Sequence, residues 1–240
     1  MICIIIVLFF AIFPPGMAAA GVIIQQKITM GHPGKPGSVT HRELIFQDDK
    51  EKFSINDHVS AVFDARNRTA ILLDSAHKMF RELPTTAAPA LMLDPNHLLY
   101  ATFKSTGKTH TILGYRCRDY SATSYGNPLI IATIACFSTQ PAGAREFHHF
   151  VQAVLKSGPH QTTNSLPPGM PLMIESIGTV NLAIVPPDVS PQEAARFKNR
   201  IAKIPPQVTH VEVTKITSKK LPPQEFGVPP GYTRQGPAPH

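Results

Sequence analysis

The sequence contains no tryptophan and only three cysteines, and its first charged residue is Lys27. Lys and Arg never form a run longer than the pair Lys219-Lys220, so the net charge of +7 is spread along the chain. This scatter favours a soluble basic protein, and the lack of a nucleic-acid motif disfavours nucleic acid as a partner. An anionic membrane surface is the other partner that a basic protein could meet. With 42% apolar residues, the chain can bury the core of one domain.

The uncharged N-terminal stretch has the pattern of a signal peptide. Ile2–Phe13 is uninterrupted apolar sequence, Pro14-Pro15-Gly16 breaks it, and Ala18-Ala19-Ala20 supplies small residues for a signal peptidase. An apolar core of 12 residues is too short to span a bilayer, which needs roughly 20. We therefore predict cleavage after Ala20, removal of residues 1–20, and a periplasmic or secreted location.

The absence of Lys or Arg before the apolar core leaves a second interpretation open. In that interpretation the whole stretch ahead of Lys27 stays in place as an anchor. The Pro-Pro-Gly break argues against an anchor, because it interrupts a continuous membrane helix.

Cleavage would leave two cysteines, Cys117 and Cys136, in an oxidising compartment. This predicts a disulfide, and two buried free thiols are the alternative. Tyr115–Ser124 and Leu129–Phe137 have strand-like sequences, separated by the turn signal Tyr125-Gly126-Asn127-Pro128. A four-residue loop there would place the cysteines directly opposite each other, at a non-hydrogen-bonded pair where the chains come closest. We therefore expect a cross-strand disulfide within a hairpin.

The remaining sequence is rich in short apolar segments separated by turn signals, which predicts a mainly antiparallel β-sheet. Leu91–Phe103 is ambiguous, because its apolar residues would also suit a short helix that begins near Asp94-Pro95. The other expected strands are Val22–Met30, Val39–Phe46, Lys52–Asn56, His58–Phe63, Thr69–Leu73, His77–Leu83, Thr109–Leu113, Leu172–Ile177, Thr179–Val185 and Val208–Thr217.

Two segments carry helical signals. Ala144–Leu155 has apolar residues at spacings of three and four, and Ser190 caps a second helix with Pro191 at its first position and Glu193 completing a capping box. Strands and helices together define an α+β domain over residues 21–221, followed by a Pro-rich C-terminal tail, residues 222–240. If the first helix covers a concave sheet, the lid of a ligand cavity is formed by Phe147, Phe150, Val151 and Leu155. Otherwise these four side chains fill a core.

Signals for catalysis, cofactors and metals are weak. His148 and His149 point about 100° apart on a helix, and no H-x-x-x-H or H-E-x-x-H spacing occurs, so no metal site is expected. The sequence has no G-x-S-x-G motif, the turn that carries the nucleophilic serine of α/β-hydrolases. Gly107-Lys108-Thr109 lacks the leading glycine of a phosphate loop and precedes a strand. We therefore expect a protein that is not an enzyme, with no catalytic residue and no cofactor.

Four segments, taken in order, resemble an uncharacterised bacterial exported family that has the fold of the LolA and LolB lipoprotein carriers. Lys108–Tyr120 is similar to that family's "tI-x-Gy-x-C-x-x-Y" strand, and Leu166–Leu172 to its "lP-x-G-x-PL" segment. The strand-turn-strand Ala61–Phe80 and the segment Phe226–Tyr232, similar to "F-x-x-P-x-GY", complete the set. The resemblance implies a LolA-like curved half-barrel sheet whose concave side is covered by helices.

In LolA and LolB the cavity between sheet and helices receives the acyl chains of lipoproteins. The resemblance therefore implies an exported, non-catalytic protein that binds or carries a hydrophobic ligand, such as a lipid or a lipoprotein acyl chain. The alternative is a cell-envelope module with a filled core and no small ligand, which binds a protein partner. An empty apolar cavity beneath the helix of Phe147 would favour the carrier, and a packed one would favour the module.

Overall fold

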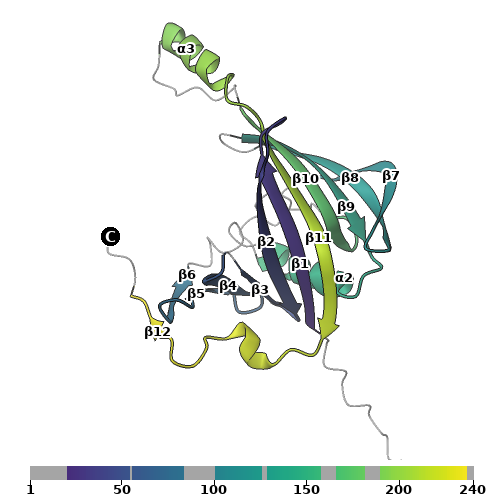
Figure 1. Ribbon diagram of the computed structural model, residues 1–240, viewed down its shortest axis with the longest axis vertical. Coiled ribbons are helices and arrows are strands. Elements are labelled where there is room, and N and C mark those ends of the chain that lie inside the picture. Colours follow the sequence, from purple (N-terminus) through teal and green to yellow (C-terminus); the bar gives the residue numbers. More distant parts are fainter. Residues whose placement is uncertain are drawn as a thin grey trace, which may run out of the picture.

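The computed structural model describes residues 21–54, 56–83, 101–125, 129–157, 166–181 and 190–236, so the predicted signal peptide lies outside the described residues. Over these residues the chain forms a 12-stranded sheet in the order β12-β6-β5-β4-β3-β2-β1-β11-β10-β9-β8-β7 (Figure 1). Neighbouring strands are antiparallel except β12 and β6, which are parallel.

The strands are β1 (Gly21–Gly31), β2 (Ser38–Gln47), β3 (Lys50–Ser54), β4 (Val59–Asp64), β5 (Thr69–Asp74), β6 (Met79–Leu83), β7 (Lys104–Ile112), β8 (Tyr115–Tyr125), β9 (Leu129–Ser138), β10 (Met170–Val180), β11 (Gln207–Lys219) and β12 (Thr233–Arg234). The helices are α2 (Ala144–Ser157), α3 (Pro191–Ile201) and the 3-10 helix η2 (Pro223–Phe226).

The part of the sheet that runs from β2 to β7 forms a curved wall, and α2 lies on its concave side (Figure 1). α2 contacts β2 and β10, and its residues Phe150 and Val151 are fully buried. The expected α+β class, with a mainly antiparallel and curved sheet, is confirmed.

The second predicted helix is present, but it does not cover the sheet. α3 begins at the predicted capping box, where the N–H of Glu193 donates to Ser190 Oγ (3.3 Å) and the N–H of Ser190 donates to Glu193 Oε2 (3.1 Å). None of its residues is buried, and it extends away from the end of the sheet (Figure 1). The expectation that both helices close the concave side is therefore wrong for α3, because its apolar stripe is narrow and its remaining residues are polar or charged.

The main core lies between the concave face of the sheet and α2. Val22 on β1 and Leu44 and Phe46 on β2 point into it, as expected from the period of two along a strand. The ring of Phe150 contacts the rings of Phe46 and Phe63, with centroids 5.5 and 6.0 Å apart. Burial of apolar surface, at roughly 25 cal/mol per Å², holds the helix on the sheet.

The opposite face of the part of the sheet from β2 to β6 is covered by the C-terminal segment (Figure 1). Lys52 Nζ lies 2.6 Å from Glu225 Oε1, and β12 adds to the sheet edge beside β6. The Pro-rich segment from Pro222 onward, expected as a tail, thus packs against the sheet as far as it is described. The second buried cluster that it completes consists of Ile45, Val62, Leu73, Leu221 and Phe226.

The hairpin of β8 and β9 contains the predicted disulfide, but its register differs from the prediction by two residues. Cys117 and Cys136 are bonded, with their Cα atoms 5.4 Å apart. Cys136 pairs with Asp119, however, so the cysteines are diagonal neighbours and not directly opposite. A shift of two keeps every side chain on its own face, and residues 126–128 of the predicted turn lie outside the described residues. The alternation therefore could not distinguish the two registers.

β10 joins the end of one predicted strand to the start of the next. Leu172–Ile177 and the beginning of Thr179–Val185 form one continuous strand, because Gly178 stays in the ladder opposite Gln207. Residues 182–185 lie outside the described residues, as does most of the ambiguous segment Leu91–Phe103.

Candidate functional site

A pocket of about 370 Å³ opens where β7, β8 and β9 lie side by side. Its lining combines the side chains of Arg116 and Arg118 from β8 with the rings of Tyr120 and Phe137 and with Thr109 of β7. Ligand pockets in proteins typically have volumes of about 300–1,000 Å³, so this pocket is at the lower end of the range for small-molecule sites.

The turn between β7 and β8 fixes the position of Arg116. Leu113 and Gly114 both have positive φ, 52° and 81°, and form a two-residue turn that matches the twist of the flanking strands. The N–H of Arg116 donates to Gln140 Oε1 (2.8 Å), and Ser138 Oγ donates to the carbonyl of Arg116 (2.8 Å). Both backbone polar groups of Arg116 are therefore held by residues at the end of β9 and just after it.

The aromatic wall of the pocket is part of the main core. Phe137 pairs with Arg118 across the β8–β9 ladder, which places the guanidinium of Arg118 on the same face of the sheet as the ring. The ring of Phe137 makes edge-on contacts with Tyr120 (centroids 5.8 Å apart) and Phe103 (5.5 Å). This side of the pocket is therefore apolar and held in place by packing.

The two arginines of the pocket are exposed, and neither has an acidic partner among the residues that the structure describes. Because Arg116 and Arg118 are two positions apart on one strand, their side chains leave the same face. Guanidinium groups bind carboxylate or phosphate oxygens through paired, charge-assisted hydrogen bonds. The pocket is therefore complementary to a ligand that joins an anionic group to an apolar one.

The neighbouring acid, Asp119, faces the other side of β8 and does not neutralise these arginines. Its Oδ2 lies 2.8 Å from Nε2 of His110, and its side chain is buried. The disulfide lies on the same face as Asp119, since Cys136 is its ladder partner. The bond joins β8 to β9 directly behind the pocket and so keeps the arginines beside Phe137.

A second polar group lies inside the main core. Glu51 is 0% exposed, and neither of its carboxyl oxygens has a hydrogen-bond partner among the described residues. Burial raises the pKa of Glu51 to about 8, against the opposing effect of the Arg42 charge. Arg42 donates from Nε and Nη2 to Gln26 Oε1 (3.1 and 2.8 Å), and burial lowers its pKa. At neutral pH Glu51 is thus mostly a neutral carboxylic acid that can donate a hydrogen bond.

The residues predicted as a cavity lid lie in the main core. Phe147, Phe150 and Val151 are buried, and the rings of Phe147 and Phe150 lie 5.6 and 5.5 Å from that of Phe46. The side chain of Leu155 lies outside the described residues. The structure brings the three described residues together against β2, and their role as ligand contacts stays a prediction.

Sequence reasoning did not single out the arginines of the pocket or the buried polar group. Arg42 lies two and four positions before the inward-facing residues Leu44 and Phe46 and so on the same face of β2, which makes a charge at a core position visible in the sequence. Arg116 and Arg118 flank Cys117 in the segment that carries the family resemblance, but one sequence alone does not show which side of a strand meets a pocket.

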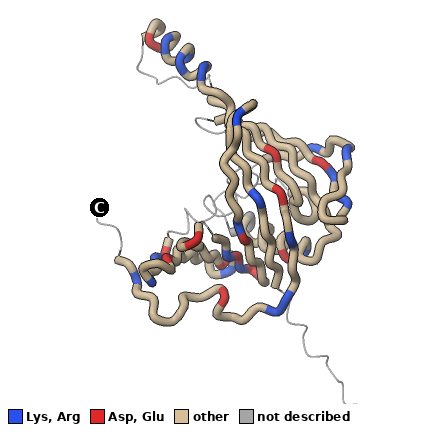
Figure 2. Tube along the Cα trace, in the orientation of Figure 1, with Lys and Arg blue, Asp and Glu red and all other residues tan. Residues whose placement is uncertain are grey.

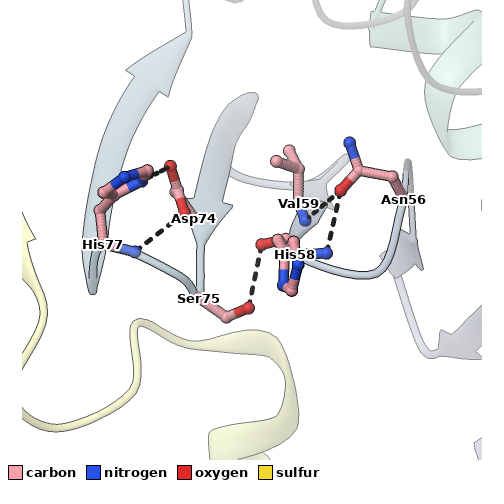
Figure 3. Close-up of polar contacts among 6 residues, drawn as sticks. All are labelled: Asn56, His58, Val59, Asp74, Ser75 and His77. Atoms are coloured by element: carbon pink, nitrogen blue, oxygen red, sulfur yellow. Dashed lines mark hydrogen bonds and ion pairs between the residues drawn. The ribbon is translucent and has the colours of Figure 1, made fainter.

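A cluster of polar contacts joins two turns in the smaller part of the sheet, between β3 and β4 and between β5 and β6 (Figure 3). Asn56 Oδ1 accepts the N–H of His58 (2.9 Å), and Ser75 Oγ donates to the carbonyl of His58 (3.1 Å). Asp74 Oδ2 lies 2.8 Å from Nδ1 of His77, and this hydrogen bond lowers the pKa of Asp74. The Ser75 hydroxyl meets a carbonyl group and not the His77 ring, so these contacts brace the two turns and do not pair a nucleophile with a base.

Among the described residues, no group of three or more His, Cys, Asp or Glu side chains could hold a metal ion. No helix in the described part of the chain is long and apolar enough to cross a membrane. The expected absence of a metal, a cofactor and catalytic residues stays a prediction.

No protein-family model matches the sequence, and no curated protein matches it. Among solved structures, PNGF-II is similar over 90% of this chain with 15% identity and a TM-score of 0.41, and this chain spans only 30% of the PNGF-II chain. A LolA superfamily protein from Nitrosomonas europaea is similar over 87% of this chain and 90% of its own, with 6% identity and a TM-score of 0.33. At these scores the two likenesses assign neither a family nor a function.

Proposed function

We propose that this protein binds an amphipathic ligand, with an apolar body such as a lipid or fatty acyl chain and an anionic head group. The observation that supports this most directly is the pocket in which two arginines without acidic partners face an aromatic wall. Arg116 and Arg118 hold the carboxylate or phosphate oxygens, and Tyr120 and Phe137 pack against the nearest methylene groups. Binding involves no covalent chemistry, so the protein is a LolA-like carrier or receptor and not an enzyme.

The size of the pocket limits how much of the ligand it holds. A volume of about 370 Å³ accommodates a head group and a short hydrocarbon segment. A longer chain extends out of the pocket, because Phe137 at its back belongs to the packed main core.

A periplasmic or secreted location is part of this proposal. The Cys117–Cys136 disulfide is compatible with an oxidising compartment. Determination of the N-terminal residue of the protein recovered from the periplasm or the medium tests the signal peptide. Gly21 as the first residue would agree with cleavage, and a retained Met1 would support the anchor.

Native mass spectrometry of the purified protein, followed by organic extraction, tests the ligand. We expect a lipid or fatty acid to co-purify at close to one per chain. The double variant R116Q/R118Q should purify empty and bind a fluorescent fatty acid about a hundredfold more weakly, because hydrogen bonds to charged groups contribute roughly 1.5–3 kcal/mol each.

The matched control is R68Q/R145Q, which removes two exposed arginines from the β4–β5 turn and from α2. It should keep both the bound lipid and the affinity for the probe. A wild-type protein that is empty and fails to bind the probe would contradict the proposal. Equal loss in the control would show that overall charge, and not the pocket, governs binding.

Two observations favour a second function, that of an envelope module that binds a protein partner. The space beneath the start of α2 is filled by Phe147 and Phe150 packed on Phe46. In addition, eight of the nine residues of the edge strand β7 are exposed, which leaves that edge accessible to a strand from another protein. An empty protein whose photocrosslinker at Lys108 captures one envelope protein would favour this function over the carrier.

A further inference from the structure

α3 leaves the body of the protein at one end of the sheet and has no buried residue (Figure 1). Its first turn is stabilised locally by the capping box of Ser190 and Glu193, with Pro191 at the first helical position. The helix therefore begins at a defined residue without support from the sheet. Packing within the protein does not account for the amphipathic character of α3.

Apolar side chains follow one face of α3. Ala194, Phe197 and Ile201 are spaced by three and four residues, which places them on one stripe. Arg196 and Lys198 lie about 100° to either side of Phe197, so cations flank the stripe on both sides. Long basic side chains in such positions can place their charges at a polar surface while the stripe enters an apolar one.

The charge of this segment has one dominant sign. From Ser190 to Ile204 there are four cations, and Glu193 is the single acid. Glu193 already accepts the hydrogen bonds of the capping box. Figure 2 shows the basic residues along α3 and the acid at its outer end. The four cations are Arg196, Lys198, Arg200 and Lys203.

The end of the sheet that carries α3 also exposes apolar side chains. Ile177 and Gly31 both pair with Val208, just after the helix, and Nδ1 of His32 lies 3.0 Å from the carbonyl oxygen of Pro206. These contacts bring the ends of β1 and β10 next to the segment that follows α3. Of the nine large apolar side chains that are exposed in the described part of the chain, six lie at this end, and we call them the rim: Met30, Val39, Tyr125, Leu129, Ile177 and Ile204.

We propose that α3 and the rim dock the protein on the surface of an anionic lipid bilayer. The stripe of Phe197 and Ile201 enters the boundary between head groups and acyl chains, and the four cations meet the lipid phosphates. The excess of cations over acids selects an anionic bilayer over a neutral one. This docking surface lies apart from the pocket of Arg116 and Arg118, so it does not depend on the proposed ligand.

Flotation with lipid vesicles tests the docking surface. The purified protein is mixed with vesicles of phosphatidylcholine alone or of equal parts phosphatidylcholine and phosphatidylglycerol. We expect binding to the mixed vesicles and at least about tenfold weaker binding to the neutral ones. The variant R196Q/K198Q/R200Q/K203Q should bind the mixed vesicles about a hundredfold more weakly.

A matched variant separates this surface from net charge. K108Q/K215Q/K219Q/K220Q removes the same charge from exposed positions on β7, on β11 and just after it, and should bind the mixed vesicles nearly as the wild type does. Because every substituted side chain is exposed, both variants should keep the wild-type circular dichroism spectrum and melting temperature.

A fluorescent reporter gives an independent measurement. The chain has no tryptophan, so Phe197→Trp supplies a single indole, whose emission should shift to shorter wavelength on the mixed vesicles. The proposal is overturned if the wild type does not float, if the matched variant loses as much binding as the α3 variant, or if the indole emission does not move. Capture of an acidic protein that is lost in the α3 variant, without vesicle binding, would overturn the assignment to lipid.

Discussion

Glu51 is a carboxyl group between Phe46 and Phe63, its partners in the sheet, and its pKa of about 8 follows from that burial. A buried carboxylate without hydrogen-bond partners is unfavourable, so the group takes up a proton on folding. Because the pKa is raised from 4.5, the folded state binds more protons than the unfolded state between about pH 4.5 and 8. The stability is therefore complete below this window and falls as the pH rises through it.

The substitution Glu51→Gln should remove this pH dependence. Glutamine has nearly the same shape and carries no charge, so the variant keeps its stability where the wild type loses several kcal/mol, at about 1.4 kcal/mol per pKa unit. Urea unfolding between about pH 5 and 9 measures the effect. Glu43→Gln, on the opposite face of β2, should keep the wild-type slope. Parallel pH profiles for the wild type and Glu51→Gln would show that Glu51 does not titrate in this window.

Among the elements, the β8–β9 hairpin combines the disulfide with the wall of the pocket. The variant C117A/C136A should lose about 3 kcal/mol of unfolding free energy, because the bond closes a loop with a sequence separation of 19. Urea unfolding with and without reductant measures this loss. The reduced wild type should match the variant, and the variant should not respond to reductant. Equal stability of all three would mean that the bond does not constrain the unfolded chain.

The same hairpin shows what the sequence can and cannot predict. The two strands and the bonded pair Cys117–Cys136 follow from alternation and cysteine count. The register does not follow, because a two-residue shift preserves both signals and is decided by packing of residues such as Phe137 against the core. α3 is a related case: its capping box predicts where the helix begins, but local sequence says nothing of where it lies.

The candidate site is harder to predict from the sequence than the fold, because its two arginines look like ordinary solvent-exposed residues of a strand. Arginines on a strand are usually solvated, and only the pairing of Arg118 with Phe137 shows that one lies beside an aromatic wall. The apolar stripe of α2 gives a clear helical pattern that points to Phe147 and Phe150, and these two residues pack in the core.

At the scale of the whole molecule, the C-terminal segment covers the face of strands β2 to β6 that is opposite α2. Phe226→Ala should therefore destabilise the protein by about 3 kcal/mol, the range expected for truncation of a buried phenylalanine. Val228→Ala, a change at a side chain that is 36% exposed, is the control and should change little. Thermal unfolding of both variants measures the difference. If the two variants have the same melting temperature, packing of the C-terminal segment on the sheet does not stabilise the protein.

The position of β1 in the sheet determines when the sheet can be completed during synthesis. β1 lies between β2 and β11, and Gly21 pairs with Lys219, 198 positions later in the chain. At synthesis rates of about 5–20 residues per second, the first strand waits roughly 10–40 seconds before its partner exists. The two parts of the sheet on either side of β1 can join only after β11 has been synthesised. Until then the polypeptide has no completed fold to unravel, which is the condition in which a chain can thread through a translocation channel.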